Sequence, residues 1–509
     1  MSTSATQDIP APVFRTATTL LADLKQDDTT AVGILARHLQ HLDVVDPALN
    51  TVVLTDRPGA TGSAHRADEE RRRGVRRPLL GVPVTVKEHI AVTGLPATSG
   101  DPGRADLRPP DAPCVSRLRE AGAVVVGKTN QSAHGRDWQT YNAVYGITNN
   151  PWDLTRTPGG SSGGGAAAVA AGIVPIDLGT DTAGSLRLPA AFCGVYAHRP
   201  TEGSVAGLRP APARPLPLPR MTEVGPIARS ADDLRMVLDV LAPAVPGTHR
   251  EASNLRGLRV ALLSPPRWFD MHPDVESAYH RLADVLASHV RALTWCTPDL
   301  PGGLTAQHDT FLAVLAAQGA RLTPQEEREA FAAALSSSGD PRDDAWASGL
   351  FPTSGTRACW ARHRHQLRLA WDDFFDTWDL LIAPVTSVVA FRHDPGKAAD
   401  WFSTLDLGGR TGRYNDLFFP ASLAALPGLP ATVFPAGTSP EGLPVGLQVL
   451  ARPGDDRLSI GFAGLLADLI GGYRPPPALE GGQGHRTPRE PKRRMVCSAR
   501  STSRSKPSW

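Results

Sequence analysis

Cysteine is scarce in this 509-residue sequence: there are five, and no two of them form a C-x-x-C pair. No group of histidines lies at the spacing of metal ligands either. This distribution excludes a disulfide framework and a zinc site, because both need several cysteines or histidines at defined separations. We therefore expect reduced thiols, a cytoplasmic location, and neither a metal nor an organic cofactor.

Long apolar runs are also absent. No uninterrupted run approaches the length of about 20 residues that a membrane-spanning helix needs. Residues 1–13 contain neither the basic region nor the apolar region of a secretory signal. We expect these 13 residues to be a loose leader, and we expect no membrane partner.

The chain has little excess charge of either sign. Its formal net charge of +2 predicts no polyanionic partner such as a nucleic acid. The charge is nevertheless uneven, because residues 481–509 contain eight Lys or Arg residues and a single Glu. Residues 476–509 are rich in Ser, Pro and Arg without apolar periodicity, which predicts a disordered basic tail, with a nucleic-acid-binding arm as the alternative.

The first half of the chain alternates between two hydrophobic periods. Apolar residues have helical spacing in residues 16–42, and the pattern changes to that of a strand at residues 79–86. Lys87 follows this strand on the face opposite its valines, because side chains alternate along a strand. Helices are predicted at 112–120 and 166–171, and strands at 123–126 and 173–178. This alternation indicates an α/β fold whose sheet is covered by helices.

The second half is less regular. Residues 244–377 are more polar and have helical periodicity at 275–290 and 330–334, so we expect a variable helical insertion there. Strand patterns return at 380–389, 431–434 and 445–450. Because nothing marks a linker, we expect one large domain over residues 14–475.

Two glycine-rich segments contain serines: residues 158–165 (PGGSSGGG) and residues 179–187 (GTDTAGSLR). Glycine allows backbone N–H groups to come close to a reacting atom, since no Cβ intervenes. A serine hydroxyl is a weak nucleophile at neutral pH and needs a base within hydrogen-bond reach. Lys87 can be this base if burial keeps it neutral; an ordinary solvated strand-end cation is the alternative.

Other catalytic patterns are rejected. Residues 122–129 (GAVVVGKT) match a P-loop formally, but the four residues between the glycines are apolar and belong in a strand. The S-x-x-K pattern at residues 503–506 lies in the predicted tail, and Ser185 has no G-x-S-x-G elbow. Cys193 follows the second serine segment in what is predicted to be a buried helix, so it is expected to act as a small apolar residue.

Together, these segments resemble the amidase signature family. The resemblance is carried by residues 81–87, 122–130, 148–152, 158–164, 179–187, 189–194, 426–431 and 442–448. It implies an α/β fold in which helices cover both faces of a central mixed β-sheet in a single large domain. It also implies a Ser-Ser-Lys triad that attacks amides.

Carried over to this sequence, the resemblance assigns Ser185 as the nucleophile, Ser161 as the bridging serine and Lys87 as the base. The backbone N–H groups of Thr182, Ala183, Gly184 and Ser185 would form the oxyanion hole. Departures from the usual family pattern are Ala183 in place of Gly, Gly165 in place of Ser, and Glu88-His89 in place of Asp-Asn. Asp181 and Arg187 are interpreted as structural partners that shape the nucleophile loop.

The substrate is less defined. By position, Gly135, Arg136 and Trp138 would border the acyl pocket, with Trp138 able to stack on an apolar or aromatic acyl group. The expected partner is a small-molecule amide, hydrolysed through an acyl-enzyme, and a homodimer stays open. Two alternatives remain: the glutaminase subunit of a tRNA-dependent amidotransferase, and an acyltransferase of a biosynthetic pathway.

Overall fold

The computed structural model describes residues 12–208, 221–242, 250–320 and 323–480. Of the predicted leader (1–13) and tail (476–509), residues 1–11 and 481–509 lie outside the described residues. The remaining parts are not irregular: residues 12–13 belong to a short 3-10 helix (Pro12–Phe14), and Pro477–Glu480 form α16. Within them, none of the helices combines the length and the apolar character needed to cross a bilayer.

Helices and strands alternate along most of the chain. The helices are α1 (Ala17–Lys25), α2 (Ala31–Leu49), α3 (Arg57–Arg72), α4 (Pro113–Glu120), α5 (Gly163–Ala170), α6 (Arg187–Cys193), α7 (Ala231–Leu241), α8 (Pro273–Leu286), α9 (Gly303–Ala320), α10 (Gln325–Ser336), α11 (Pro341–Leu350), α12 (Ser354–Thr377), α13 (Gly396–Ala399), α14 (Phe418–Ala425), α15 (Asp456–Ile470) and α16 (Pro477–Glu480). The strands are β1 (Val52–Thr55), β2 (Pro83–Lys87), β3 (Val124–Thr129), β4 (Tyr141–Asn142), β5 (Gly146–Ile147), β6 (Ile176–Asp181), β7 (Tyr196–Arg199), β8 (Glu223–Ala228), β9 (Arg259–Leu263), β10 (Ala292–Cys296), β11 (Leu380–Pro384), β12 (Thr404–Asp406), β13 (Thr411–Arg413), β14 (Ala431–Thr438) and β15 (Pro444–Leu450).

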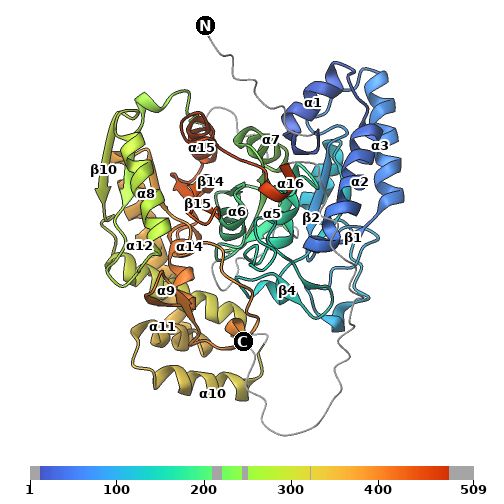
Figure 1. The fold of residues 1–509 in the computed structure, drawn as a ribbon. Helices are drawn as coiled ribbons and strands as arrows, with labels where there is room; N and C mark the ends of the chain where they lie inside the picture. Colours follow the sequence, from blue (N-terminus) through green and yellow to red (C-terminus); the bar gives the residue numbers. More distant parts are fainter. Residues whose placement is uncertain (1–11, 209–220, 243–249, 321–322, 481–509) are drawn as a thin grey trace.

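In the described residues, 11 strands form one sheet in the order β1-β3-β2-β6-β8-β7-β14-β15-β11-β9-β10. The sheet is mixed: β2 is parallel to β3 and to β6, whereas β8 is antiparallel to β6 and β7. The sheet runs through the centre of the molecule, with the N-terminal helices at one edge and α8 and α12 beside the other (Figure 1). This arrangement confirms the predicted α/β fold with a central mixed sheet.

Helices cover both faces of the sheet, and each face has its own apolar core. One core joins α2, α3, α5, α6, α9 and α14 to inward-facing strand residues such as Val124 and Val126. The other joins α4, α7, α8 and α15 to Val84, Val86 and Val125. Neighbouring residues of β3 belong to different cores because successive side chains of a strand point to opposite faces.

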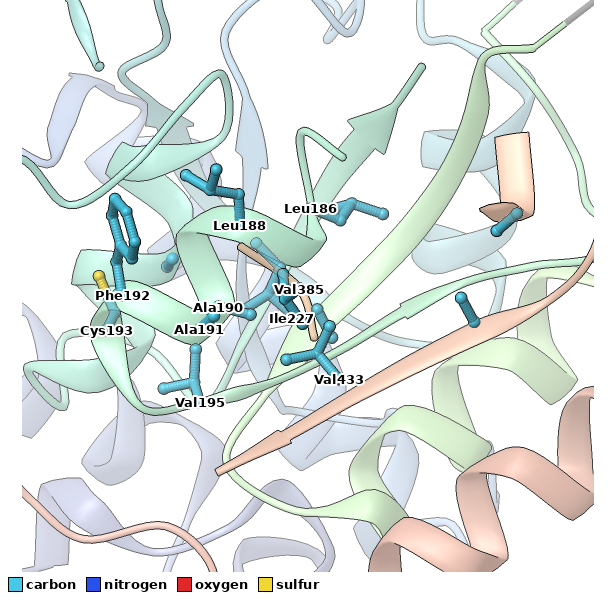
Figure 2. Close-up of a cluster of buried hydrophobic side chains, with 14 of the residues drawn as sticks. Leu186, Leu188, Ala190, Ala191, Phe192, Cys193, Val195, Ile227, Val385 and Val433 are labelled. Atoms are coloured by element: carbon cyan, nitrogen blue, oxygen red, sulfur yellow. The ribbon is translucent and has the colours of Figure 1, made fainter. Parts of the chain in front are cut away.

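The short helix α6 belongs to the first core. All seven of its residues are buried, and Figure 2 shows Ala190 and Ala191 near Ile227 of β8 and Val433 of β14, whereas Phe192 and Cys193 lie further from these strands. Because Ser185 lies two residues before the start of this helix, the core that contains α6 holds the second serine segment in place.

The helical spacing in residues 16–42 corresponds to two helices, because Thr30 caps a new helix by accepting a hydrogen bond from Gly33 N. The structure differs from the sequence-based expectation further along the chain. The expected insertion at 244–377 is only partly helical, since β9 and β10 extend the central sheet at its edge. Helices α9–α12 follow these strands, and α10 and α11 project from the main body (Figure 1).

Candidate active site

Lys87 is the last residue of β2, in the middle of one half of the sheet. It lies between Thr129 of β3 and β6, and its side chain is 1% exposed. Its Nζ lies 2.7 Å from Ser161 Oγ, 2.8 Å from Ser162 Oγ and 3.2 Å from Thr180 Oγ1. The predicted alternation of side chains is confirmed, and Lys87 is not a solvated strand-end cation.

Ser161 and Ser162 directly precede α5. Ser162 N donates a hydrogen bond to Ser185 O at 3.2 Å, which joins the two serine segments through their backbones. Ser162 Oγ also lies 3.3 Å from Thr180 O of β6. The structure therefore brings Lys87, Ser161 and Ser185 together from three segments that are far apart in the sequence.

Ser185 lies in the turn between β6 and α6. In this turn Gly184 adopts a φ of +97°, which favours glycine, and Trp138 packs against it. Asp181 holds the turn through its carboxylate, which accepts hydrogen bonds from Gly184 N at 2.9 Å and Leu186 N at 3.3 Å. The turn that carries Ser185 is therefore held in place by Asp181, the last residue of β6.

A buried ion pair supports this turn. Arg187 binds the Asp181 carboxylate with Nε and Nη2 at 2.9 and 3.0 Å, and donates to Gln448 Oε1 of β15 at 3.0 Å. Burial by itself would raise the pKa of Asp181, but Arg187, Arg199 and the Gly184 amide outweigh it and hold that pKa well below its usual range. Asp181 therefore stays ionised, as its predicted structural role requires.

The predicted oxyanion hole needs one correction. Gly184 N is bound to Asp181 Oδ1, so this amide is not available to an oxyanion. Within the described residues, the backbone amides of Thr182, Ala183 and Ser185 have no hydrogen-bond acceptor. These three amides are the remaining candidates, because an oxyanion hole needs donors that no other group occupies.

Burial changes the proton affinity of the lysine. It lowers the pKa of Lys87 to about 7, against the opposing attraction of the Asp177 and Asp181 carboxylates. Burial also lowers the pKa of His89 to about 3, with the Lys87 charge acting in the same direction. A lysine with a pKa of about 7 is substantially neutral at physiological pH and can accept a proton.

His89, one of the departures from the usual family pattern, belongs to the surroundings of the lysine. Its Nδ1 lies 2.5 Å from Gln131 Oε1, and its Nε2 lies 3.4 Å from Thr180 Oγ1. Since Gln131 Oε1 can only accept, Nδ1 carries the proton and Nε2 is free to accept from Thr180. His89 thus orients a hydroxyl that contacts Lys87.

A cavity of about 440 Å³ opens onto Ser185 and the candidate oxyanion amides. The structure places all three predicted substrate-binding residues, Gly135, Arg136 and Trp138, on its wall. The loop that carries them is hydrogen-bonded to another residue of the cavity wall, because Tyr414 Oη donates to Asp137 Oδ1 at 2.5 Å.

Most of the cavity wall was not predicted. Besides the predicted Trp138, its aromatic part consists of Phe331 of α10, Trp346 of α11, Trp401, Tyr414 and Phe418, the first residue of α14. Several of these rings contact each other, with 5.0 Å between the ring centroids of Trp138 and Phe418 and 4.5 Å between those of Trp346 and Trp401. This aromatic part of the wall therefore offers a contact surface for a flat or bulky apolar group.

Metal-dependent catalysis and a cysteine nucleophile have less support in the described residues. Among the described residues, no group of three or more His, Cys, Asp or Glu side chains could hold a metal ion. Cys193 lies in the core under α6 (Figure 2), donates to Pro158 O at 3.4 Å, and has its thiol pKa raised by burial. A buried thiol of this kind is a poor nucleophile.

Comparisons with known proteins agree with this geometry. The family model Amidase matches residues 34–459. A glutamyl-tRNA(Gln) amidotransferase subunit from Chloroflexus aurantiacus is 34% identical over 482 residues, which cover 87% of this chain and 93% of the relative. An indoleacetamide hydrolase of Bradyrhizobium diazoefficiens is 32% identical over 480 residues, covering 90% of this chain and 87% of that protein. A crystal structure of an amidase, 29% identical, superposes with a TM-score of 0.74 over 90% of this chain and 100% of that chain.

Proposed function

Because this chain belongs to the amidase family, we propose that it hydrolyses the C–N bond of a small carboxamide through an acyl-enzyme on Ser185. The observation that carries this proposal is the buried contact of 2.7 Å between Lys87 Nζ and Ser161 Oγ, beside the cavity that Ser185 lines. A neutral amine in contact with a serine is the arrangement that activates a hydroxyl nucleophile without a histidine.

In the proposed first half-reaction, Ser185 Oγ bonds to the amide carbon and its proton passes to Ser161, while Ser161 gives its own proton to Lys87. The carbonyl oxygen becomes an oxyanion held by the amides of Thr182, Ala183 and Ser185. Each such donor contributes about 3 kcal/mol to transition-state stabilisation. The proton returns through Ser161 to the leaving nitrogen, the C–N bond breaks, and an ester on Ser185 remains.

Water resolves the ester in the second half-reaction. It attacks the acyl carbon while Ser161 and Lys87 accept its proton, and Ser185 leaves with a proton relayed back to it. The products are a carboxylic acid and ammonia or an amine, and the enzyme regains its starting protonation state. Because Lys87 must be neutral to begin each half-reaction, activity should rise with pH through the lysine pKa of about 7.

The aromatic wall supports an aryl or arylalkyl acyl group as the substrate class. Free glutamine would bury little apolar surface against these rings, although the charged residues Arg136, Asp137, Lys397 and Asp400 also line the cavity. The name of the Chloroflexus relative favours the alternative that this chain is the glutaminase subunit of a tRNA-dependent amidotransferase. The name of the Bradyrhizobium relative, an indoleacetamide hydrolase, favours the small aromatic amide.

A screen of amides that measures released ammonia or amine separates these functions. The set should contain aryl, arylalkyl and short aliphatic amides together with free glutamine, each with and without hydroxylamine. We expect turnover of aromatic amides and formation of the hydroxamate, since hydroxylamine intercepts an acyl-enzyme. Turnover of glutamine alone would support the glutaminase function, and the absence of hydroxamate with every hydrolysed amide would contradict the acyl-enzyme.

The aromatic wall also gives a prediction for Trp346, which lies on α11 and contacts Trp401 and Phe418. Trp346→Leu keeps an apolar side chain but removes the ring, so we expect the ratio of kcat/KM for an aryl amide to that for a short aliphatic amide to fall about tenfold. Trp295→Leu is the matched control, because Trp295 lies on edge strand β10 and is 40% exposed. Equal losses for both amides in the Trp346 variant would argue against a role in selectivity.

A further inference from the structure

A second buried carboxylate lies beside Lys87 in the sheet. Asp177 on β6 is paired with Thr85 of the parallel strand β2, two residues before Lys87, and has no exposed surface. Thr85 Oγ1 donates to Asp177 Oδ1 at 2.8 Å, so Thr85 and Asp177 point to the same face. Lys87 shares that face, because it is two residues from Thr85 along the strand.

In the part of the chain that the structure describes, only one oxygen of this carboxylate has protein donors. Oδ1 accepts from Thr85 and, at 3.0 Å, from Thr129 Oγ1 of β3. Within the described residues, Oδ2 has no hydrogen-bond partner. It occupies the space beside Gly165 of α5, where a Cβ would lie 2.0 Å from it. Gly165, a departure from the usual serine, thus makes room for a carboxylate that is unfavourable to ionise without a nearby cation.

Among the described residues, Lys87 is the cation that acts on Asp177. The other charged groups packed around β2 and α5 have their own partners; Arg229, for example, donates to Val169 O and Val174 O. Lys128 of β3 binds Pro96 O, and Asp181 of β6 is held by Arg187. His89, in the loop after β2, is neutral and bound to Gln131. On α2, His38 is hydrogen-bonded to the carbonyls of Gly172 and Ile173 and its pKa is lowered to about 3 by burial, while α5 contains only Gly, Ala and Val.

We propose that Asp177 is a positioning residue that acts through Lys87: its carboxylate is the counter-charge of the protonated amine and sets the pH at which Ser161 and Ser185 become activated. This inference rests on the proposed function. Burial raises the pKa of Asp177 to about 6, against the hydrogen bonds from Thr85 and Thr129 and the Lys87 charge, while the pKa of Lys87 falls to about 7. The two groups therefore titrate in one range and bind protons as a coupled pair.

Asp177→Asn tests this role with little change of shape. The asparagine oxygen can still accept from Thr85 and Thr129, and its NH₂ group takes the place of Oδ2. Removing the negative charge disfavours the protonated lysine. The rate at which a fluorophosphonate labels Ser185 rises with pH, and the midpoint of this rise should therefore move about one pH unit lower. Labelling needs no knowledge of the amide substrate, and kcat/KM for any amide found in the screen should move by the same amount.

The outcomes separate this inference from the proposed function. If the Ser185→Ala variant is labelled as fast as the unmodified protein, the proposed function fails. If Ser185 is labelled in Asp177→Asn with an unchanged midpoint or one at higher pH, Asp177 is only structural and the inference is overturned.

Two further variants complete the test. Asp233→Asn is the matched control, because Asp233 is also a buried carboxylate but binds Ala17 N and Thr18 N at the start of α1, far from Asp177 in the sequence. The midpoint of labelling in this variant should not move.

If Asp177→Asn does not fold, the double variant Thr85→Val and Thr129→Val replaces it. Without these donors the carboxylate is neutral over more of the pH range, so the midpoint should again move lower, by less than one unit. An unmoved midpoint in this variant also overturns the inference.

Discussion

Ser185→Ala should lower amide turnover by about 10⁴-fold or more and abolish labelling by a fluorophosphonate, while the fold is retained. The side chain removed is a hydroxyl that lines the cavity and is 7% exposed, so its loss leaves the packing of α6 intact. Asp181 continues to hold the turn through the amides of Gly184 and Leu186, which this substitution does not change. Labelling followed by intact-mass spectrometry, together with circular dichroism, checks both statements.

Cys193→Ala is the matched control for this prediction. Cys193 is the other buried candidate nucleophile, eight residues further along, and its side chain belongs to the apolar core under α6 (Figure 2). This variant should be labelled at the rate of the unmodified protein and keep its amidase activity. Full labelling of Ser185→Ala, or loss of labelling in Cys193→Ala alone, would move the nucleophile to another residue.

The fold was predictable where local patterns were long and regular. The valines before Lys87 gave the correct face of β2, and the run of short residues after the first serine segment gave α5. β9 and β10 were missed because a run such as RVALL is too short to distinguish a strand from part of a helix. Their place at the sheet edge is decided by the pairing of β9 with β11, which lies more than a hundred residues later in the sequence, and by the pairing of β10 with β9.

The candidate site likewise has parts that could be predicted from the sequence and parts that could not. Lys87 and the two serine segments were found through motifs, and the contacts between Lys87 and the first segment confirm that they meet. The aromatic wall could not be predicted, because Phe331, Trp346 and Phe418 come from separate segments without a shared motif. The use of the Gly184 amide by Asp181 was also invisible, since it depends on the exact path of one turn.

Lys87→Ala is the second variant with a large expected effect: amide turnover should fall by about 10³-fold or more, because general-base catalysis at the attacking hydroxyl is lost. The substitution leaves a space lined by the hydroxyls of Ser161, Ser162 and Thr180, which contact Nζ in the unmodified protein. A small primary amine such as methylamine fits this space and should restore part of the activity. Its rescue should increase with pH as the free amine is deprotonated.

Lys87→Arg distinguishes a base from a fixed positive charge. A guanidinium keeps the charge near Asp177 but stays protonated throughout the accessible pH range, so it cannot accept the proton of Ser161. If Lys87 works as a neutral base, Lys87→Arg is as inactive as Lys87→Ala and is not rescued at any pH, while thermal unfolding shows that it is folded. Substantial activity in the arginine variant would mean that the site needs only a cation, and the relay from Ser185 through Ser161 would then have to end on another group.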